Sequence, residues 1–125
     1  MKQSSGFSLI EILISFLLLS MILLGLDAIQ IYTLRKAHSV YFLSLATIQL
    51  NNLSERLQAS NGRDLNSLWV SWNKENQAIL PQGTGMIQGN FPHYVATIFW
   101  GTRFQTVCQP YLKGKSGCLK ISVTL

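Results

Sequence analysis

Acidic side chains are scarce in this chain of 125 residues, which has five of them against ten lysines and arginines and a formal net charge of +5. Beyond residue 27 the only acids are Glu55, Asp64 and Glu75. Few carboxylates are thus left for general acid–base chemistry, and the chain has no G-x-S-x-G, P-loop or H-E-x-x-H motif. We therefore expect a protein that is not an enzyme and that binds no cofactor.

Metal-ligating side chains are equally few. The chain has two histidines, His38 and His93, and two cysteines, Cys108 and Cys118. A four-ligand site would require all four to converge, so we expect no metal. In an exported chain a lone cysteine pair at this spacing forms a disulfide, whereas in the cytosol it stays as two thiols. Closing this loop would contribute about 3 kcal/mol to the free energy of unfolding.

Proline is absent from Phe7 to Leu80, so nothing forces a helix to break over that distance. Within it, Phe7 to Leu26 is an apolar run of about twenty residues, enough for a helix to cross the hydrocarbon core of a membrane. Glu11 interrupts this run near its start, where a charge costs on the order of 3 kcal/mol. An ionisable side chain in lipid indicates a functional site and needs a partner.

Processing of the chain would create that partner. Cleavage between Gly6 and Phe7 would place a new α-amine about one helical turn before Glu11. In an array of such helices, the amine of one chain would neutralise the carboxylate of its neighbour. A secretory signal peptide is disfavoured, because no A-x-A-like site follows the apolar run.

The segment Gly6-Phe7-Ser8-Leu9-Ile10-Glu11 resembles the type III signal of type IV pilins and pseudopilins. This resemblance implies cleavage after Gly6, methylation of the Phe7 amine by a prepilin peptidase, and a role for Glu11 in assembly. It also implies a long N-terminal helix packed on a small antiparallel sheet, which is an α+β fold.

Further along the helix, the stretch from Leu23 to Gln30 is similar to the "LLGL-x-A-x-Q" stretch of the PilV-type minor pilins, or pilus modification proteins. Ser39-Val40-Tyr41 and the stretch from Leu53 to Ser60 also resemble that family. The resemblance implies a minor pilin that takes part in initiating and assembling type IV pili, and in tip display or adhesion. Its implied partners are other minor and major pilins, the prepilin peptidase and a tip adhesin.

The second part of the predicted helix is amphipathic. Its apolar side chains recur at helical spacing: Leu34, Tyr41, Leu45, Ile48, Leu50, Leu53 and Leu57. We expect this stripe to pack on a domain and the helix to end near Ala59, before Asn61 and Gly62.

After Gly62 the pattern changes to β structure. Short alternation predicts a strand or strand edge at Leu68–Trp72, and Pro81–Gly85 predicts a turn. Tyr94–Trp100 is the strongest predicted strand, and Leu119–Leu125 is a second with one apolar face. We expect the three tryptophans to lie in the core of the small sheet.

These features predict a leader at 1–6, a transmembrane and assembly helix at 7–27, and a periplasmic domain at 28–125. Arg35 and Lys36 follow the apolar run and only Lys2 precedes it, so charge bias alone would place the C-terminus on the cytoplasmic side of the membrane. The cysteine pair favours the opposite orientation. The pilin resemblance also implies that the C-terminus lies outside, and we adopt that orientation. The expected location is the bacterial inner membrane, with the C-terminus in the periplasm, and then the pilus at the cell surface.

Two other functions fit parts of the sequence. A minor pseudopilin of a type II secretion system shares the signal and the small size. A minor pilin that binds DNA for uptake would use the basic side chains of the C-terminal part, and nucleic acid is the less favoured partner. The candidate contacts for that function are Arg103, Lys113, Lys115 and Lys120.

Overall fold

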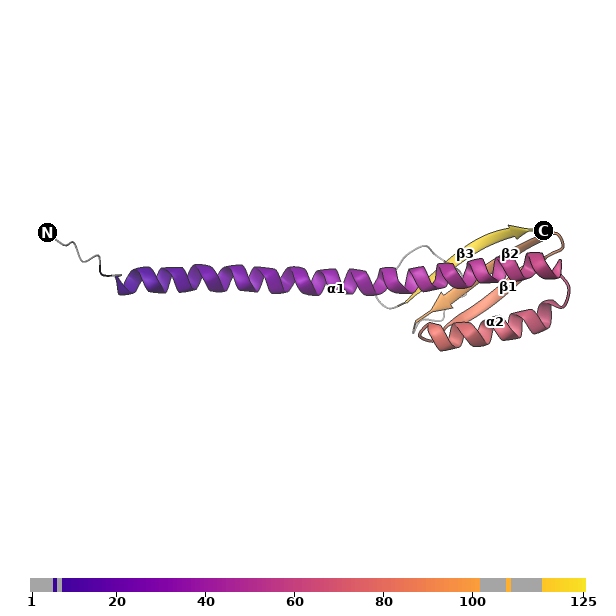
Figure 1. Ribbon diagram of the computed structural model, residues 1–125, viewed down its shortest axis with the longest axis horizontal. Helices are drawn as coiled ribbons and strands as arrows, with labels where there is room; N and C mark the ends of the chain where they lie inside the picture. The colour runs from indigo at the N-terminus through magenta and orange to yellow at the C-terminus, as the bar shows by residue number, and fades with distance from the viewer. Residues whose placement is uncertain (1–5, 7, 102–107, 109–115) are drawn as a thin grey trace. The chain divides into compact units, whose positions relative to one another are not determined.

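The computed structural model describes residues 6, 8–101, 108 and 116–125 (Figure 1). In chain order its elements are α1 (Leu9–Ser60), α2 (Leu65–Ile79), β1 (Thr84–Asn90), β2 (His93–Trp100) and β3 (Gly117–Thr124). The chain divides into two units, residues 1–36 and 37–125. The predicted α+β fold, with a long N-terminal helix and a small antiparallel sheet, is confirmed.

The first unit consists mainly of the early turns of α1. The Ser8 carbonyl accepts hydrogen bonds from the backbone N–H groups of Glu11, at 2.9 Å, and Ile12, at 3.3 Å. The helix continues through Gly25 without interruption. One glycine costs only about 1 kcal/mol relative to alanine, which the surrounding strong helix formers offset.

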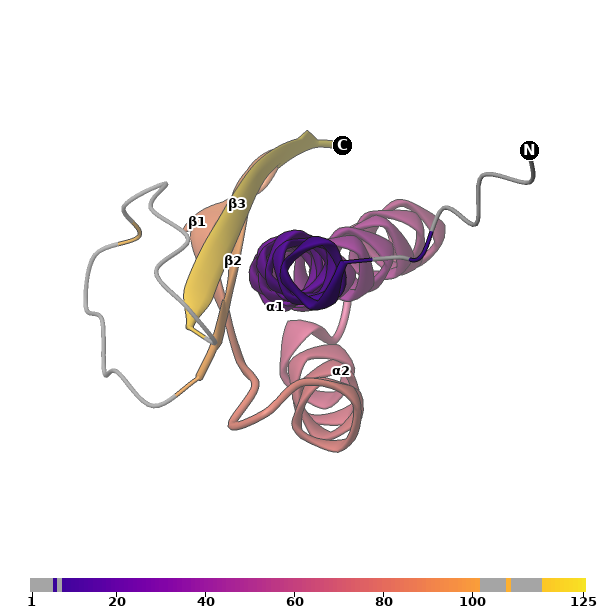
Figure 2. The ribbon, with the colours of Figure 1, turned by 90° about the vertical axis from the view of Figure 1, so that its left-hand side faces the viewer.

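The second unit is built on a three-stranded antiparallel sheet in the order β1-β2-β3. Along the central strand β2, burial alternates strictly, as expected for a strand with one face on a core. The buried positions are Tyr94, Ala96, Ile98 and Trp100. Figure 2 shows α1 and α2 on the same side of the sheet, and the shared core cluster agrees with that arrangement. The strands predicted at Tyr94–Trp100 and Leu119–Leu125 are confirmed as β2 and β3.

The last turns of α1 supply one wall of this core. Ala46, Leu50, Leu53 and Leu57 are fully buried, and each leucine removed from water stabilises the fold by about 2 kcal/mol. The predicted stripe is therefore right for its last three leucines, and Leu45 is partly buried against the same core, but it is wrong for three other members. Leu34, Tyr41 and Ile48 are all more than half exposed.

The exposure of Ile48 follows from its angle around the helix relative to the buried stripe. Ile48 lies two residues before Leu50, about 200° away at 100° per residue. A side chain at that angle points away from the sheet, whatever its hydrophobicity. The helix ends at Ser60, one residue beyond the predicted end, and Gly62 follows with a φ of 72°. Its N–H donates to the Leu57 carbonyl at 3.3 Å, as expected for a glycine that terminates a helix.

The strand predicted at Leu68–Trp72 is wrong, because these residues belong to α2. Five residues of alternation fit a strand, but the longer pattern is helical. The side chains that face the core recur at positions 65, 68, 69, 72 and 76. Trp72 is the largest fully buried side chain, and its indole N–H donates to the Gln49 carbonyl of α1 at 2.9 Å.

The turn predicted at Pro81–Gly85 is shorter than expected, because Thr84 and Gly85 already belong to β1. Two side chains of α2 hold Gly85 at the outer edge of this strand. The Trp69 indole N–H donates to the Gly85 carbonyl, and the Gly85 N–H donates to the Asn73 side-chain oxygen, each at 2.8 Å. A Cβ at Gly85 would overlap the Trp72 ring, so the close approach of helix and strand requires glycine here.

The tryptophan prediction is confirmed. Trp72 and Trp100 are buried, and Trp69 is partly buried against the core while its indole holds the edge of β1.

Candidate functional site

The residues of the N-terminal signal lie at the start of α1. Gly6 is exposed, and Phe7 lies outside the described residues. Glu11 is the acidic residue of the first helical turn, and its side chain is exposed. A carboxylate at this position interacts favourably with the positive end of the helix dipole. The dipole is therefore a favourable interaction that Glu11 makes with its own helix.

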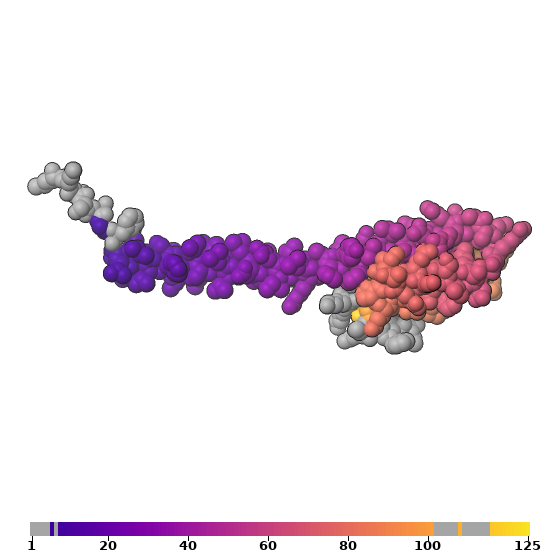
Figure 3. All heavy atoms as spheres, turned by 60° about the horizontal axis from the view of Figure 1, so that its bottom comes forward, coloured from indigo at the N-terminus to yellow at the C-terminus, as the bar shows by residue number. Residues whose placement is uncertain are grey.

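The apolar side chains around Glu11 are not covered by the described residues of their own unit. Every described residue from Ser8 to Lys36 is exposed, although this stretch consists largely of leucine and isoleucine. In Figure 3 the indigo to violet part of the helix is bare on the face in view. Soluble proteins rarely expose an apolar surface of this extent, so lipid or other chains must cover it.

Two serine side chains in this stretch are compatible with an apolar environment. The Ser15 hydroxyl donates to the Glu11 carbonyl and the Ser20 hydroxyl donates to the Leu17 carbonyl, each at 2.8 Å. Both hydroxyls are therefore satisfied without water. Among the residues that the structure describes, α1 is the helix whose length and composition would allow it to cross a membrane.

The two cysteines lie at the other end of the chain, where the structure joins them. Cys108 and Cys118 form a disulfide with their Cα atoms 5.6 Å apart, inside the usual range for such a bond. Cys118 is the second residue of β3 and is buried. The disulfide therefore ties the segment before β3 to the sheet.

Most of the predicted nucleic-acid contacts lie outside the described residues, namely Arg103, Lys113 and Lys115. Lys120 is described. It is exposed on β3, where its Cα pairs with that of Thr97 on β2. A single lysine on a strand is an ordinary solvated side chain and forms no basic patch by itself. Within the described part of the chain, no group of three His, Cys, Asp or Glu side chains is placed to hold a metal ion.

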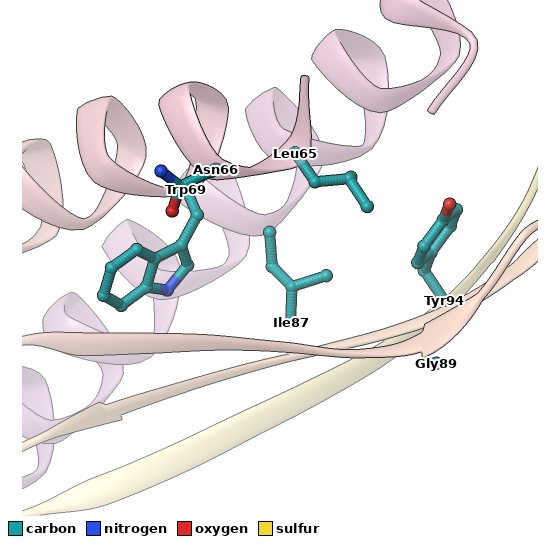
Figure 4. A pocket seen from close by; sticks show the side chains of 6 residues that line it. All are labelled: Leu65, Asn66, Trp69, Ile87, Gly89 and Tyr94. Atoms are coloured by element: carbon teal, nitrogen blue, oxygen red, sulfur yellow. The ribbon is translucent and has the colours of Figure 1, made fainter. Parts of the chain in front are cut away.

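One hollow opens on the surface of the second unit, between the start of α2 and the ends of β1 and β2 (Figure 4). It measures about 320 Å³ and is lined by Leu65, Asn66, Trp69, Ile87, Gly89 and Tyr94. Asn66 contributes an amide, and the rest of the lining is apolar or aromatic. None of the side chains in this lining is a charged acid, base or nucleophile, so the hollow has no catalytic arrangement.

Residues 1–26 match the prokaryotic N-terminal methylation motif, which is type IV prepilin-like. Comparison with curated proteins and with solved structures gives no match. The long apolar helix and the three-stranded sheet fit a type IV pilin-like α+β fold. The motif and the fold together support a protein of the type IV pilin type, a class that includes pilins and pseudopilins.

Several general properties follow from this match. The motif indicates a structural protein, which in general is not an enzyme, and it suggests a prepilin peptidase and other pilins as partners. The motif and the apolar helix fit anchoring in a membrane, followed by a place in a pilus. Sequence reasoning missed the contacts of Trp69 and Asn73 with Gly85, for which the sequence carries no local signal.

Proposed function

We propose that this chain is a minor pilin of the PilV type, a structural subunit that helps to initiate and assemble type IV pili. In this proposal residues 1–6 are the leader, residues 7–27 cross the membrane and later enter the fibre, and residues 28–125 form the periplasmic domain. The observation that carries the proposal is the N-terminal methylation motif, followed by an apolar helix that is exposed on every side.

The chemistry of the site supports an assembly role for Glu11. A prepilin peptidase cuts between Gly6 and Phe7 and methylates the new amine. The methylated amine keeps its positive charge, and in a packed array of helices it lies within reach of the Glu11 carboxylate of a neighbouring chain. Each group then neutralises the other in an environment where neither is tolerated alone.

The remaining parts of the proposal concern location and partners. The disulfide between Cys108 and Cys118 supports a C-terminal domain in the periplasm, because such bonds persist in oxidising compartments. The proposed partners are other minor and major pilins, with a tip adhesin carried by the minor pilins. The proposed role at the pilus tip is display or adhesion.

A minor pseudopilin of a type II secretion system is the second candidate, since the N-terminal methylation motif is equally compatible with it. The genes next to this one distinguish the two functions. A cluster of minor pilin genes would favour the pilus, and a secretion operon would favour the pseudopilin. DNA uptake has less support, because the basic side chains of the chain are scattered along the sequence and do not run together.

The variants Glu11→Gln and Glu11→Ala test the proposed function. Membrane insertion and cleavage should remain intact, because they depend on the leader and the apolar run, and loss of the charge eases insertion. Recovery in sheared fibres, or with partner minor pilins, should fall strongly. Breaking a buried ion pair from one side costs about 3–5 kcal/mol, because it leaves the amine of the neighbour unpaired. Normal incorporation of Glu11→Ala would show that Glu11 is merely a carboxylate at a helix end.

A second expected result is that the mature protein begins at Phe7 with a methylated amine. Intact mass and N-terminal sequencing of protein from the pilus fraction check this directly. The control is the same chain from cells without prepilin peptidase, which should keep residues 1–6. A mature chain that retains Met1 to Gly6 in both strains would contradict the pilin function.

A further inference from the structure

We propose that Tyr32 and Lys36 form a binding site for the headgroup phosphate of an anionic phospholipid, on the periplasmic side of the membrane that α1 crosses. This inference rests on the membrane stage of the proposed function, because it needs residues 7–27 to span the bilayer. The site holds the subunit at a fixed depth in the membrane before assembly.

The basic residues behind the apolar run have no role in the proposed function so far. Charge bias alone would place Arg35 and Lys36 on the cytoplasmic side, whereas the proposed orientation places both in the periplasm. They therefore do not set the orientation of the helix. A cation at the end of a membrane helix has another use, since anionic headgroups attract it.

The sequence fixes the height of these residues relative to the bilayer. The apolar run from Phe7 to Leu26 is about 30 Å long, which matches the hydrocarbon core. Asp27 follows directly, and its carboxylate opposes deeper insertion, because a charge is costly within hydrocarbon. The headgroup layer adds about 5–8 Å on each side, so on this side it extends over roughly residues 27–31.

The side chain of Lys36 reaches back into this layer. Its Cα lies one turn beyond Tyr32, but its ammonium lies over the Tyr32 ring, 5.7 Å from the ring centroid. Helical side chains lean toward the N-terminus, so both side chains point back toward the apolar run. Both residues are exposed. The ammonium therefore lies at the height of the lipid phosphates.

The helix face below the ammonium suits an acyl chain. Ile22, Gly25, Ile29 and Tyr32 recur three or four residues apart, and all lie within about 40° of Lys36 around the axis. The two isoleucines are more than half exposed, and Gly25 has open space beside its Cα. Tyrosine suits the boundary itself, because its ring is apolar and its hydroxyl is polar.

The charge on this face complements a phosphate. Among residues 8–36 the acids are Glu11 and Asp27. Asp27 lies about 180° from Lys36 around the axis, on the opposite face, and Glu11 lies about 37 Å below Lys36 along the axis. The face thus presents a cation, and no carboxylate of this stretch, at the height of the headgroups.

The height of the ammonium favours lipid over a protein partner. In the membrane stage, phosphates surround the helix on every side at this height. A carboxylate of another chain would have to be supplied at this one position. Lysine binds phosphate as a compact point charge, and its long stem allows it to follow a mobile headgroup.

The lipid selectivity of the purified full chain tests the site. The chain is held in detergent micelles with equal amounts of phosphatidylglycerol and phosphatidylcholine that carry the same acyl chains, and native mass spectrometry measures the ratio of the two lipids retained. The original chain should retain more phosphatidylglycerol. Lys36→Gln should lower the ratio about threefold or more, and Tyr32→Leu about twofold, because each removes part of the site. Lys36→Arg, which keeps the charge, should preserve it to within about 1.5-fold.

Lys74→Gln is the matched control. It removes the same charge from an exposed position of α2, so it should change the ratio by less than about 1.5-fold. Equal effects of Lys74→Gln and Lys36→Gln would overturn the site, because they would reflect net charge alone. Displacement of the lipid by an equal concentration of glycerol phosphate would also overturn it, since it would show a site for small anions.

The variant Glu11→Ala, measured for recovery in sheared fibres, distinguishes failure of the site from failure of the proposed function. If Lys36→Gln keeps the lipid ratio and Glu11→Ala is lost from fibres, the lipid site is wrong and the proposed function stands. If Lys36→Gln loses the selectivity and Glu11→Ala enters fibres normally, the lipid site stands, because it needs only the membrane stage, and the assembly role of Glu11 is wrong.

Discussion

Leu18, in the first part of α1, leaves 55% of its surface exposed, whereas Leu53, in the last part, leaves none. Both are leucines in the same helix, and both regions are rich in apolar side chains. The last part buries one stripe, Ala46, Leu50, Leu53 and Leu57, against the sheet and α2. In the first part, apolar side chains occur on all faces, and among the described residues of that unit they remain exposed.

This difference shows how the two parts of α1 suit two different environments. A single apolar stripe matches one neighbouring surface, which the domain supplies. Apolar side chains on every face match a medium or an array that surrounds the helix. Under the proposed function, stability of the domain and assembly of the helix therefore depend on separate residues of α1, and substitutions should separate them.

The largest expected effect on stability comes from shortening a leucine of the buried stripe. Leu53→Ala should lower the free energy of unfolding of the domain by about 2–5 kcal/mol, because it leaves a cavity in the core. Leu18→Ala, the matched control, should change it by less than about 0.5 kcal/mol. Unfolding of the full chain in detergent, followed by tryptophan fluorescence, measures both, since all three tryptophans lie in residues 37–125. Equal losses for the two variants would contradict the separation.

A second test removes the disulfide near the C-terminal end of the chain and asks whether the N-terminal helix is affected. Replacing Cys108 and Cys118 by serine should lower the free energy of unfolding by about 3 kcal/mol, by the loss of loop constraint. Insertion and cleavage of the N-terminal part should be unaffected. Thiol labelling of the denatured, unreduced chain should find no free thiol. Two labelled cysteines would argue against both the bond and the periplasmic location.

The smallest expected effect concerns the ion pair between the helices of the domain. The Arg56 guanidinium lies 2.9 Å from the Glu75 carboxylate, and both side chains remain more than a third exposed. Arg56→Ala should therefore lower the free energy of unfolding by only about 0.2–1 kcal/mol, and by less at high salt. Lys74→Ala, which removes a neighbouring exposed charge, is the control. A double-mutant cycle with Glu75→Gln that gives no coupling would show that the pair contributes nothing.

The sequence predicted the elements whose signals are local. The absence of proline and the long apolar run indicated α1, and dense β-branched and aromatic residues indicated β2. Alternation along residues 119–125 indicated β3 and its buried face. The N-terminal signal was equally local, since six consecutive residues carry it.

The errors arose where tertiary contacts decide. Residues 68–72 alternate like a strand, but packing of Trp72 against α1 belongs to a helical pattern that extends over a longer stretch. The strand β1 holds two glycines and several polar residues, so its intrinsic preference for a strand is weak. It forms because β2 pairs with it and because Trp69 and Asn73 bond to Gly85. Neither contact has a signature in the sequence.

The hydrogen bonds to Gly85 have a consequence when copies of the domain lie close together. An unpaired backbone at the edge of a sheet is a template for strands of other molecules, and packing in the proposed pilus would increase that risk. At Gly85 both backbone groups are already occupied by side chains of α2. A strand of another molecule therefore meets no free hydrogen-bond donor or acceptor on the Gly85 backbone. Copies of the domain can be brought close together without this part of the sheet seeding amyloid-like growth.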